Sequence, residues 1–105
     1  MQNRLDPKLR KAQILDAALK VAGVQGTDRI TFKDVASASS TSIGLVIHYF
    51  GTMTALRRAV MRAAVKREDV AIVARGLATR DPHAAKAGPE LRAAAAALLS
   101  QQAVG

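Results

Sequence analysis

The chain has 105 residues and is half apolar, but its aromatic side chains are limited to one tyrosine and two phenylalanines. Alanine and leucine dominate, which favours helices over strands. A formal net charge of +8 is typical of proteins that bind a polyanion such as nucleic acid, or an anionic membrane surface. The absence of cysteine excludes disulfides and thiolate metal sites, and no apolar run reaches the roughly 18–20 residues of a membrane span. We therefore expect a soluble, cytoplasmic, all-α protein.

A first helix is predicted over residues 7–25. Asp6 can cap its free amides, and Pro7 suits the first turn, where a missing N–H costs nothing. Gly26 is expected to end the helix, because glycine adopts the left-handed conformation freely. Apolar residues at the helical spacing i, i+3, i+4, i+7 and i+8 form one face, which consists of Ile14, Ala17, Ala18, Val21 and Ala22.

Two short helices joined by a turn are predicted next. Thr31 is positioned to cap the first of them, and Asp34 stands where the acid of a capping box belongs. The hydroxyl-rich run 37–42 favours a turn, and Ser42 is a good cap for a helix over residues 42–49. A short helix pair braced by a preceding helix is the arrangement of a helix-turn-helix DNA-binding unit, here over residues 31–50.

A fourth, longer helix is predicted after Gly51, with Thr52 as its cap. It is expected to run to about Asp69 or as far as Ala74, with Gly76 as its stop. Its apolar face consists of Leu56, Ala59, Val60, Ala63 and Ala64.

The remaining residues read as a loop over 78–88 and a last helix from Pro89. The apolar face of that helix consists of Leu91, Ala94, Ala95, Leu98 and Leu99. The predicted architecture is a three-helix helix-turn-helix domain followed by a long helix and a short, partial helical C-terminal segment. We place the DNA-binding domain at residues 8–68 and the C-terminal segment at residues 69–105.

At this point the residues resemble the TetR family of bacterial transcriptional repressors over about residues 8–68. The resemblance implies a homodimer that reads a partly palindromic operator, and a larger C-terminal domain that binds a small effector and thereby releases DNA. Residues 69–105 would then be a truncated part of that domain, so a small-molecule effector is not expected, and a dimer is expected only if this segment permits it. The matching residues are Ile14-Leu15-Asp16-Ala17-Ala18, Gly26, Thr31, Asp34-Val35-Ala36, Ser42, Gly44, His48-Tyr49-Phe50 and Leu56.

The chain departs from the family pattern at three places in or beside the helix-turn-helix. The turn usually has glycine then valine, whereas here it is Ser40-Thr41. A serine at a positive φ costs about 1 kcal/mol relative to glycine. Ile47 stands where the family usually has a phosphate-binding tyrosine, and Met53 where it has a lysine. These changes remove polar contacts to the DNA backbone.

In this fold the N-terminal residues of the recognition helix point into the major groove. Gly44 would allow the helix backbone to approach DNA closely. Ile43 and Leu45 can touch thymine methyl groups. Backbone anchors are expected at Thr31, Lys33 and Tyr49. A basic flank, namely Arg4, Lys8, Arg10 and Lys11, can reach along the backbone or into the minor groove. The groove-facing residues are predicted to be Thr41, Ser42, Ile43, Gly44, Leu45, Ile47 and His48, with Val46 and Phe50 in the core.

The function predicted from these features is that of a sequence-specific DNA-binding transcriptional regulator, interpreted as a repressor, with duplex operator DNA as its partner. No nucleophile–base constellation, phosphate-cradling glycine loop or paired metal ligands are present, so no enzymatic activity, metal or cofactor is expected. Two alternatives remain open. One is a truncated regulator without effector sensing, and the other is a small basic helical module that binds a protein or a membrane surface through residues 55–75.

Overall fold

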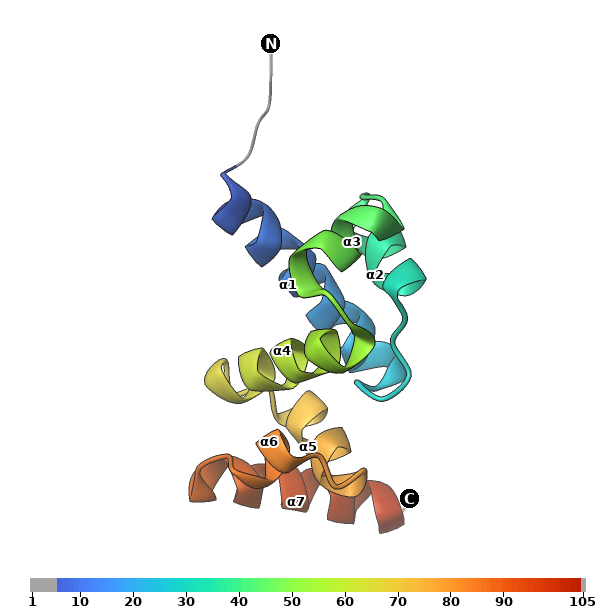
Figure 1. Cartoon of the computed structure of the whole chain (residues 1–105). Coiled ribbons are helices and arrows are strands. Elements are labelled where there is room, and N and C mark those ends of the chain that lie inside the picture. Colours follow the sequence, from blue (N-terminus) through green and yellow to red (C-terminus); the bar gives the residue numbers. More distant parts are fainter. Residues whose placement is uncertain (1–5, 105) are drawn as a thin grey trace.

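The computed structural model describes residues 6–104, and within them it contains seven helices and no strand (Figure 1). The all-α prediction is therefore confirmed, and the first three helices fall within about a residue of their predicted positions. Arg4, one of the four predicted basic flank residues, lies outside the described residues. The helices are α1 (Pro7–Gln25), α2 (Phe32–Ser39), α3 (Ile43–Phe50), α4 (Met53–Lys66), α5 (Val70–Ala78), α6 (Pro82–Ala85) and α7 (Pro89–Val104).

Helix α1 begins and ends at the residues that its sequence signals indicate. The Asp6 carboxylate accepts a hydrogen bond from the Lys8 amide at 2.7 Å, and Pro7 occupies the first helical position. At the other end Gly26 has φ +92° and donates its amide to the Ala22 carbonyl at 2.8 Å. The predicted apolar face packs into the core, with only Val21 half-buried.

Helix α4 ends earlier than either predicted boundary, at Lys66 rather than Asp69 or Ala74. The chain turns at Glu68, which has φ +55°. The Asp69 amide donates to the Ala64 carbonyl at 2.8 Å, the bond that closes a Schellman motif. Asp69 then caps a separate helix, α5, by accepting from the Ile72 amide at 3.2 Å. The chain therefore has two helices where the longer of the two predicted boundaries made one continuous helix.

The prediction that Gly76 ends a helix is wrong, because Gly76 lies buried inside α5. A Cβ atom at this position would lie 2.5 Å from the Met61 Cε atom and 2.7 Å from the Ala84 Cβ atom. Both distances are far below van der Waals contact. The glycine is therefore explained by the close approach of α5 to α4 and α6, not by a helix end.

The segment 78–88, predicted to be a loop, contains the short helix α6. Asp81 caps it by accepting from the His83 amide at 2.8 Å and from the Ala84 amide at 3.1 Å, and Pro82 is its first residue. This is the same Asp-Pro signal that begins α1.

The apolar face of α7 differs from the prediction at one residue. Ala94 is exposed, although its predicted partners on that face are buried or half-buried.

The core is continuous from α1 to α7, with α4 at its centre. Helices α1–α3 lie on one side of α4 and helices α5–α7 on the other (Figure 1). Burial of apolar side chains is the main source of stability in such a core. The largest side chains that are fully buried come from both sides: Ile14, Ile30, Val35, Val46, Leu56, Val60, Met61, Ile72 and Val73.

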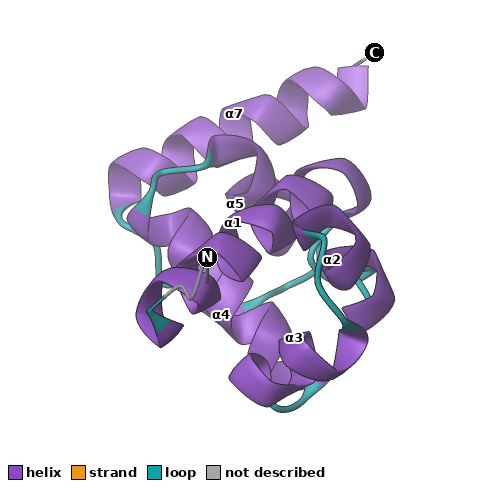
Figure 2. Ribbon diagram, turned by 90° about the horizontal axis from the view of Figure 1, so that it is seen from above, coloured by secondary structure: helices purple, strands orange, loops and turns teal. Residues whose placement is uncertain are grey.

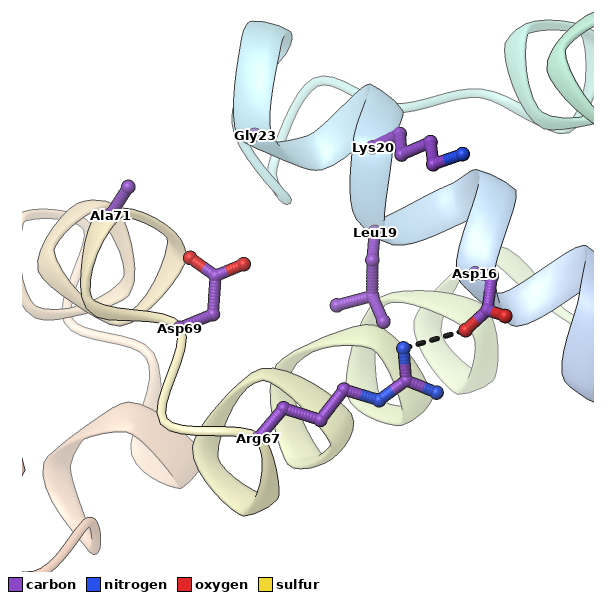
Figure 3. Close-up of a pocket in the computed structure, with 7 residues that line it drawn as sticks. All are labelled: Asp16, Leu19, Lys20, Gly23, Arg67, Asp69 and Ala71. Carbon is purple, nitrogen blue, oxygen red and sulfur yellow. Dashed lines mark hydrogen bonds and ion pairs between the residues drawn. The ribbon is translucent and has the colours of Figure 1, made fainter.

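A mixed-charge surface pocket lies where α1 meets the junction of α4 and α5 (Figure 3). The Arg67 guanidinium reaches across it to the Asp16 carboxylate at 2.6 Å, and Asp69 and Lys20 also line it. Both partners of the ion pair are about half exposed, so solvent screening keeps its contribution to stability small. The pair links α1 to the end of α4.

Candidate nucleic-acid interface

The start of α2 is held by a complete capping box. The Thr31 hydroxyl accepts from the Asp34 amide at 3.1 Å, and the Asp34 carboxylate accepts from the Thr31 amide at 3.2 Å. The Gln25 side chain donates to the same carboxylate at 3.2 Å, which links the end of α1 to α2. Hydrogen bonding to the side chains of Thr31 and Gln25 lowers the pKa of Asp34.

The turn between α2 and α3 is a Schellman motif built on a serine. Ser40 has φ +55° and ψ +43°, a left-handed conformation. The Thr41 amide donates to the Ala36 carbonyl at 2.9 Å, and the Ser40 amide donates to the Ser37 carbonyl at 3.3 Å. The hydroxyls of Ser39 and Thr41 lie 2.8 Å apart and share a hydrogen bond. These bonds fix the direction in which α3 leaves the turn.

Helix α3 presents one face to the core and another to solvent. Ser42 caps it by accepting from the Leu45 amide at 3.0 Å. Val46 and Phe50 are buried, as predicted, and anchor the helix. Ile43 and Ile47 lie on the outer face and are 45% and 41% exposed. These two side chains are four residues apart, so they share one face of the helix.

Gly44 lies on the same outer face and is not required by the fold. A Cβ atom built there meets nothing nearer than the Ser42 hydroxyl, at 3.9 Å. The protein itself would therefore accept a larger residue at this position. The absence of a side chain leaves the backbone of the first turn of α3 open to close approach from outside.

The predicted DNA-contacting residues divide into two groups by exposure. Leu45 and Tyr49 pack partly against the core, and Thr41 is engaged with Ser39, so these three are half-buried. The others are exposed: Thr31, Lys33, Ser42, Ile43, Gly44, Ile47 and His48. The exposed residues come from the first turns of α2 and α3 and from the outer face of α3.

Two neighbouring contacts support this surface from the other helices, and no sequence pattern pointed to either. The Arg57 guanidinium, on α4, donates to the Ile30 carbonyl at 3.4 Å and so connects α4 to the segment that leads into α2. The Lys11 ammonium, on α1, lies 5.4 Å from the centre of the Phe50 ring. Both contacts join residues far apart in the sequence, which helical spacing does not reveal.

Seen from above, α2 and α3 lie along the edge of the molecule opposite α7, with α1 between them and α7 (Figure 2). A brace helix and a short helix pair, with the outer face of the second helix exposed, define a helix-turn-helix protein. The comparison with known families gives the same class. Residues 14–60 match the model of the bacterial regulatory proteins of the tetR family. This N-terminal segment is therefore a helix-turn-helix domain of the TetR type.

Several curated relatives are named as HTH-type transcriptional regulators. The chain is 39% identical over 71 residues to the HTH-type transcriptional regulator BetI of Rhizobium meliloti. The aligned region covers 67% of this chain and 34% of that protein. It is 34% identical over 90 residues to the HTH-type transcriptional regulator BetI of Burkholderia mallei. Here the aligned region covers 86% of this chain and 44% of that protein. The chain thus spans less than half the length of these curated relatives. No solved structure matches it significantly.

None of the helices within residues 6–104 is both long enough and apolar enough to cross a membrane.

Proposed function

We propose that the protein is a DNA-binding transcriptional regulator, acting as a repressor in the cytoplasm, that inserts α3 into the major groove of operator DNA. The observation that carries this proposal is the outer face of α3, where Ile43, Gly44 and Ile47 are exposed and uncovered. Isoleucine side chains can contact thymine methyl groups. The bare backbone at Gly44 lets the helix approach the base edges closely.

Backbone contacts are proposed at the start of α2 and around α3. The amides of Thr31 and Asp34 are already bonded within the capping box, so the donors left in this turn are the amides of Phe32 and Lys33. They point out of the positive end of the helix, where a phosphate is favoured. The Lys33 ammonium adds charge. The hydroxyls of Thr41 and Tyr49 are proposed to serve as further phosphate donors.

The outer face of α3 offers few polar groups for reading bases. Ser42 and His48 are its exposed polar side chains, and the Ser42 hydroxyl already accepts one bond as a cap. A single DNA-binding domain is therefore expected to discriminate only modestly between DNA sequences. A homodimer on a two-fold operator would double the number of base contacts. We propose that residues 8–68 form the DNA-binding head, and that residues 69–105 support it through α4.

The test is a matched pair of glycine substitutions in helices. Gly44→Ala places a methyl group on the proposed DNA face, whereas Gly23→Ala places one on α1, where nothing lies within 4 Å of it. Neither is expected to unfold the protein. An electrophoretic shift at low salt with DNA flanking the protein's own gene should show about tenfold weaker binding for Gly44→Ala, or about 1.4 kcal/mol. Gly23→Ala should bind as the unmodified protein does.

Two outcomes would count against the proposal. Absence of any retardation of DNA by the unmodified protein would contradict DNA binding itself. Equal binding by Gly44→Ala and Gly23→Ala would contradict the insertion of α3 into the groove.

A further inference from the structure

A row of basic side chains runs along α4, outside the proposed α3 interface. Arg58, Arg62 and Lys66 follow one another at four-residue intervals, and all three are exposed. Residues at this spacing share one helix face and are separated by about 6 Å along the axis. The row therefore presents a line of positive charge about 12 Å long.

Two surface clefts border this row. On the side of α6, a cleft of about 260 Å³ is lined by Arg62, Lys66, His83 and Lys86, with Val65 between them. Its lining contains no aspartate or glutamate. Two lysines, an arginine and a histidine thus surround one concave surface, and none of them faces an acidic residue across it.

The cleft on the other side of the row lies against α1. It measures about 500 Å³, and Lys11, Arg62 and Lys66 line it together with apolar side chains. The contact of the Lys11 ammonium with the Phe50 ring places its charge beside this cleft. Here, too, no acidic residue is among the lining residues.

These positive charges are not neutralised within the part of the chain that the structure describes. The ion pair found among residues 6–104 joins Arg67 to Asp16, and neither residue lines the two clefts. Asp81 lies near Arg58, but its carboxylate already accepts two amides as the cap of α6. Unpaired like charges along one face repel one another, so a polyanion bound there would relieve the repulsion.

We propose that this basic ridge, formed by Arg58, Arg62 and Lys66 on α4 with Lys11 and Lys86 on either side, binds consecutive phosphates of a nucleic-acid backbone. It is a second, base-independent site, and it does not depend on α3 reading an operator. Arginine and lysine are the side chains that neutralise backbone phosphates, and release of counterions supplies the affinity.

The surroundings of the ridge favour a phosphate chain over a protein or a membrane. Protein interfaces rely on buried aromatic or large apolar anchors, and membrane-surface helices insert bulky apolar residues. The exposed large apolar side chains among the described residues lie elsewhere, at Leu9, Val24, Ile43 and Ile47. The apolar side chains in the cleft beside α1 are buried or half-buried, so the ridge offers charge without an exposed apolar anchor, which suits a backbone of regularly spaced phosphates.

The test compares two double variants of equal net charge. Arg62→Gln with Lys66→Gln removes two charges from the ridge, and Lys20→Gln with Arg92→Gln removes two exposed charges from α1 and α7. Binding is measured by isothermal titration with short-chain inorganic polyphosphate, and by fluorescence anisotropy with a duplex of unrelated sequence over a range of salt. The ridge variant should lose polyphosphate binding, and its salt slope on the duplex should fall by about 1.8, or 0.9 per phosphate.

The outcomes separate this site from the α3 interface. Gly44→Ala should bind polyphosphate as well as the unmodified protein, even if it binds operator DNA poorly. If both double variants lose polyphosphate binding to the same extent, the ridge is not a site, because binding would then depend on net charge alone. Tighter binding of poly-glutamate, or of vesicles rich in anionic lipid, than of polyphosphate would overturn the assignment in favour of an acidic protein or a membrane.

Discussion

Within residues 6–104, three residues other than glycine hold a left-handed conformation, and each follows a helix. Ser40, Glu68 and Arg80 have φ values of +55°, +55° and +61°. In each case the next amide reaches back to close a Schellman motif, as the Asp81 amide does to the Gly76 carbonyl at 2.8 Å. Residues with a Cβ atom are strained in this conformation, by about 1 kcal/mol. The helix ends are therefore set by the packing of the helices on either side, against local preference.

Replacing Ser40 by glycine should stabilise the protein by about 1 kcal/mol, because the strain at positive φ is removed. The free energy of unfolding in urea measures the effect. Ser37→Gly is the matched control: Ser37 is exposed within α2, so glycine there should destabilise by up to about 1 kcal/mol. The same sign for both substitutions would contradict the assigned strain.

Asp34 should make the stability depend on pH in the acid range. Its pKa is lowered in the folded protein, chiefly by hydrogen bonding to Thr31 and then Gln25. A lowered pKa contributes stability that is present above the unfolded value of about 3.9 and is lost as the pH falls through the folded value. Asp34→Asn should therefore flatten the loss of stability below about pH 4, as followed by thermal unfolding. An unchanged loss of stability in Asp34→Asn would contradict this contribution of Asp34.

At the scale of elements, signals carried by single residues predicted the helices well. The caps at Asp6, Thr31, Ser42 and Thr52 all form, because a side chain that bonds the first free amides is a local interaction. The end of α4 was not predicted, because the residue that turns left-handed there is Glu68 and not glycine. The start of α6 had the same signal as α1, an Asp-Pro pair, and was recognisable on that ground.

The candidate site was predictable in part for the same reason. The spacing of Val46 and Phe50 showed which face of α3 is buried, and so which residues face outward. Spacing could not show how far Leu45 and Tyr49 are covered, because their burial depends on a core to which distant parts of the sequence contribute. The clefts beside the basic ridge depend likewise on the positions of α1 and α6 relative to α4.

Gly23 and Gly76 should respond in opposite ways to the same substitution. Both lie within helices, where alanine is favoured by about 0.5–1 kcal/mol. At Gly23 nothing lies within 4 Å of the added methyl group, so alanine should stabilise by about that amount. At Gly76 the methyl group would collide with Met61 and Ala84, and we expect a loss of about 1–3 kcal/mol. Thermal unfolding measures both, and a gain at Gly76 would contradict the close packing of α5.

At the scale of the whole molecule, the buried side chains of the helix-turn-helix and those of α5–α7 belong to one cluster. Leu56, Val60 and Met61, all fully buried on α4, belong to it and lie between the two sides. A core shared in this way predicts that the head and the C-terminal helices unfold together. The division of the chain near residue 69 would then be one of function and not of folding.

The single tyrosine makes this cooperativity measurable. Tyr49 lies on α3 and the chain has no tryptophan, so intrinsic fluorescence reports the helix-turn-helix alone, whereas circular dichroism reports all the helices. Ile72→Ala, in α5, removes a fully buried side chain and should cost about 3 kcal/mol. In one cooperative unit the Tyr49 transition in urea shifts as far as the dichroism transition does, although the substitution lies outside the head. The exposed neighbour Ala71→Ser should shift neither. If the dichroism midpoint shifts and the Tyr49 midpoint does not, the head and the C-terminal helices fold as two separate units. In that case the destabilisation caused by Ile72→Ala would not extend beyond α4.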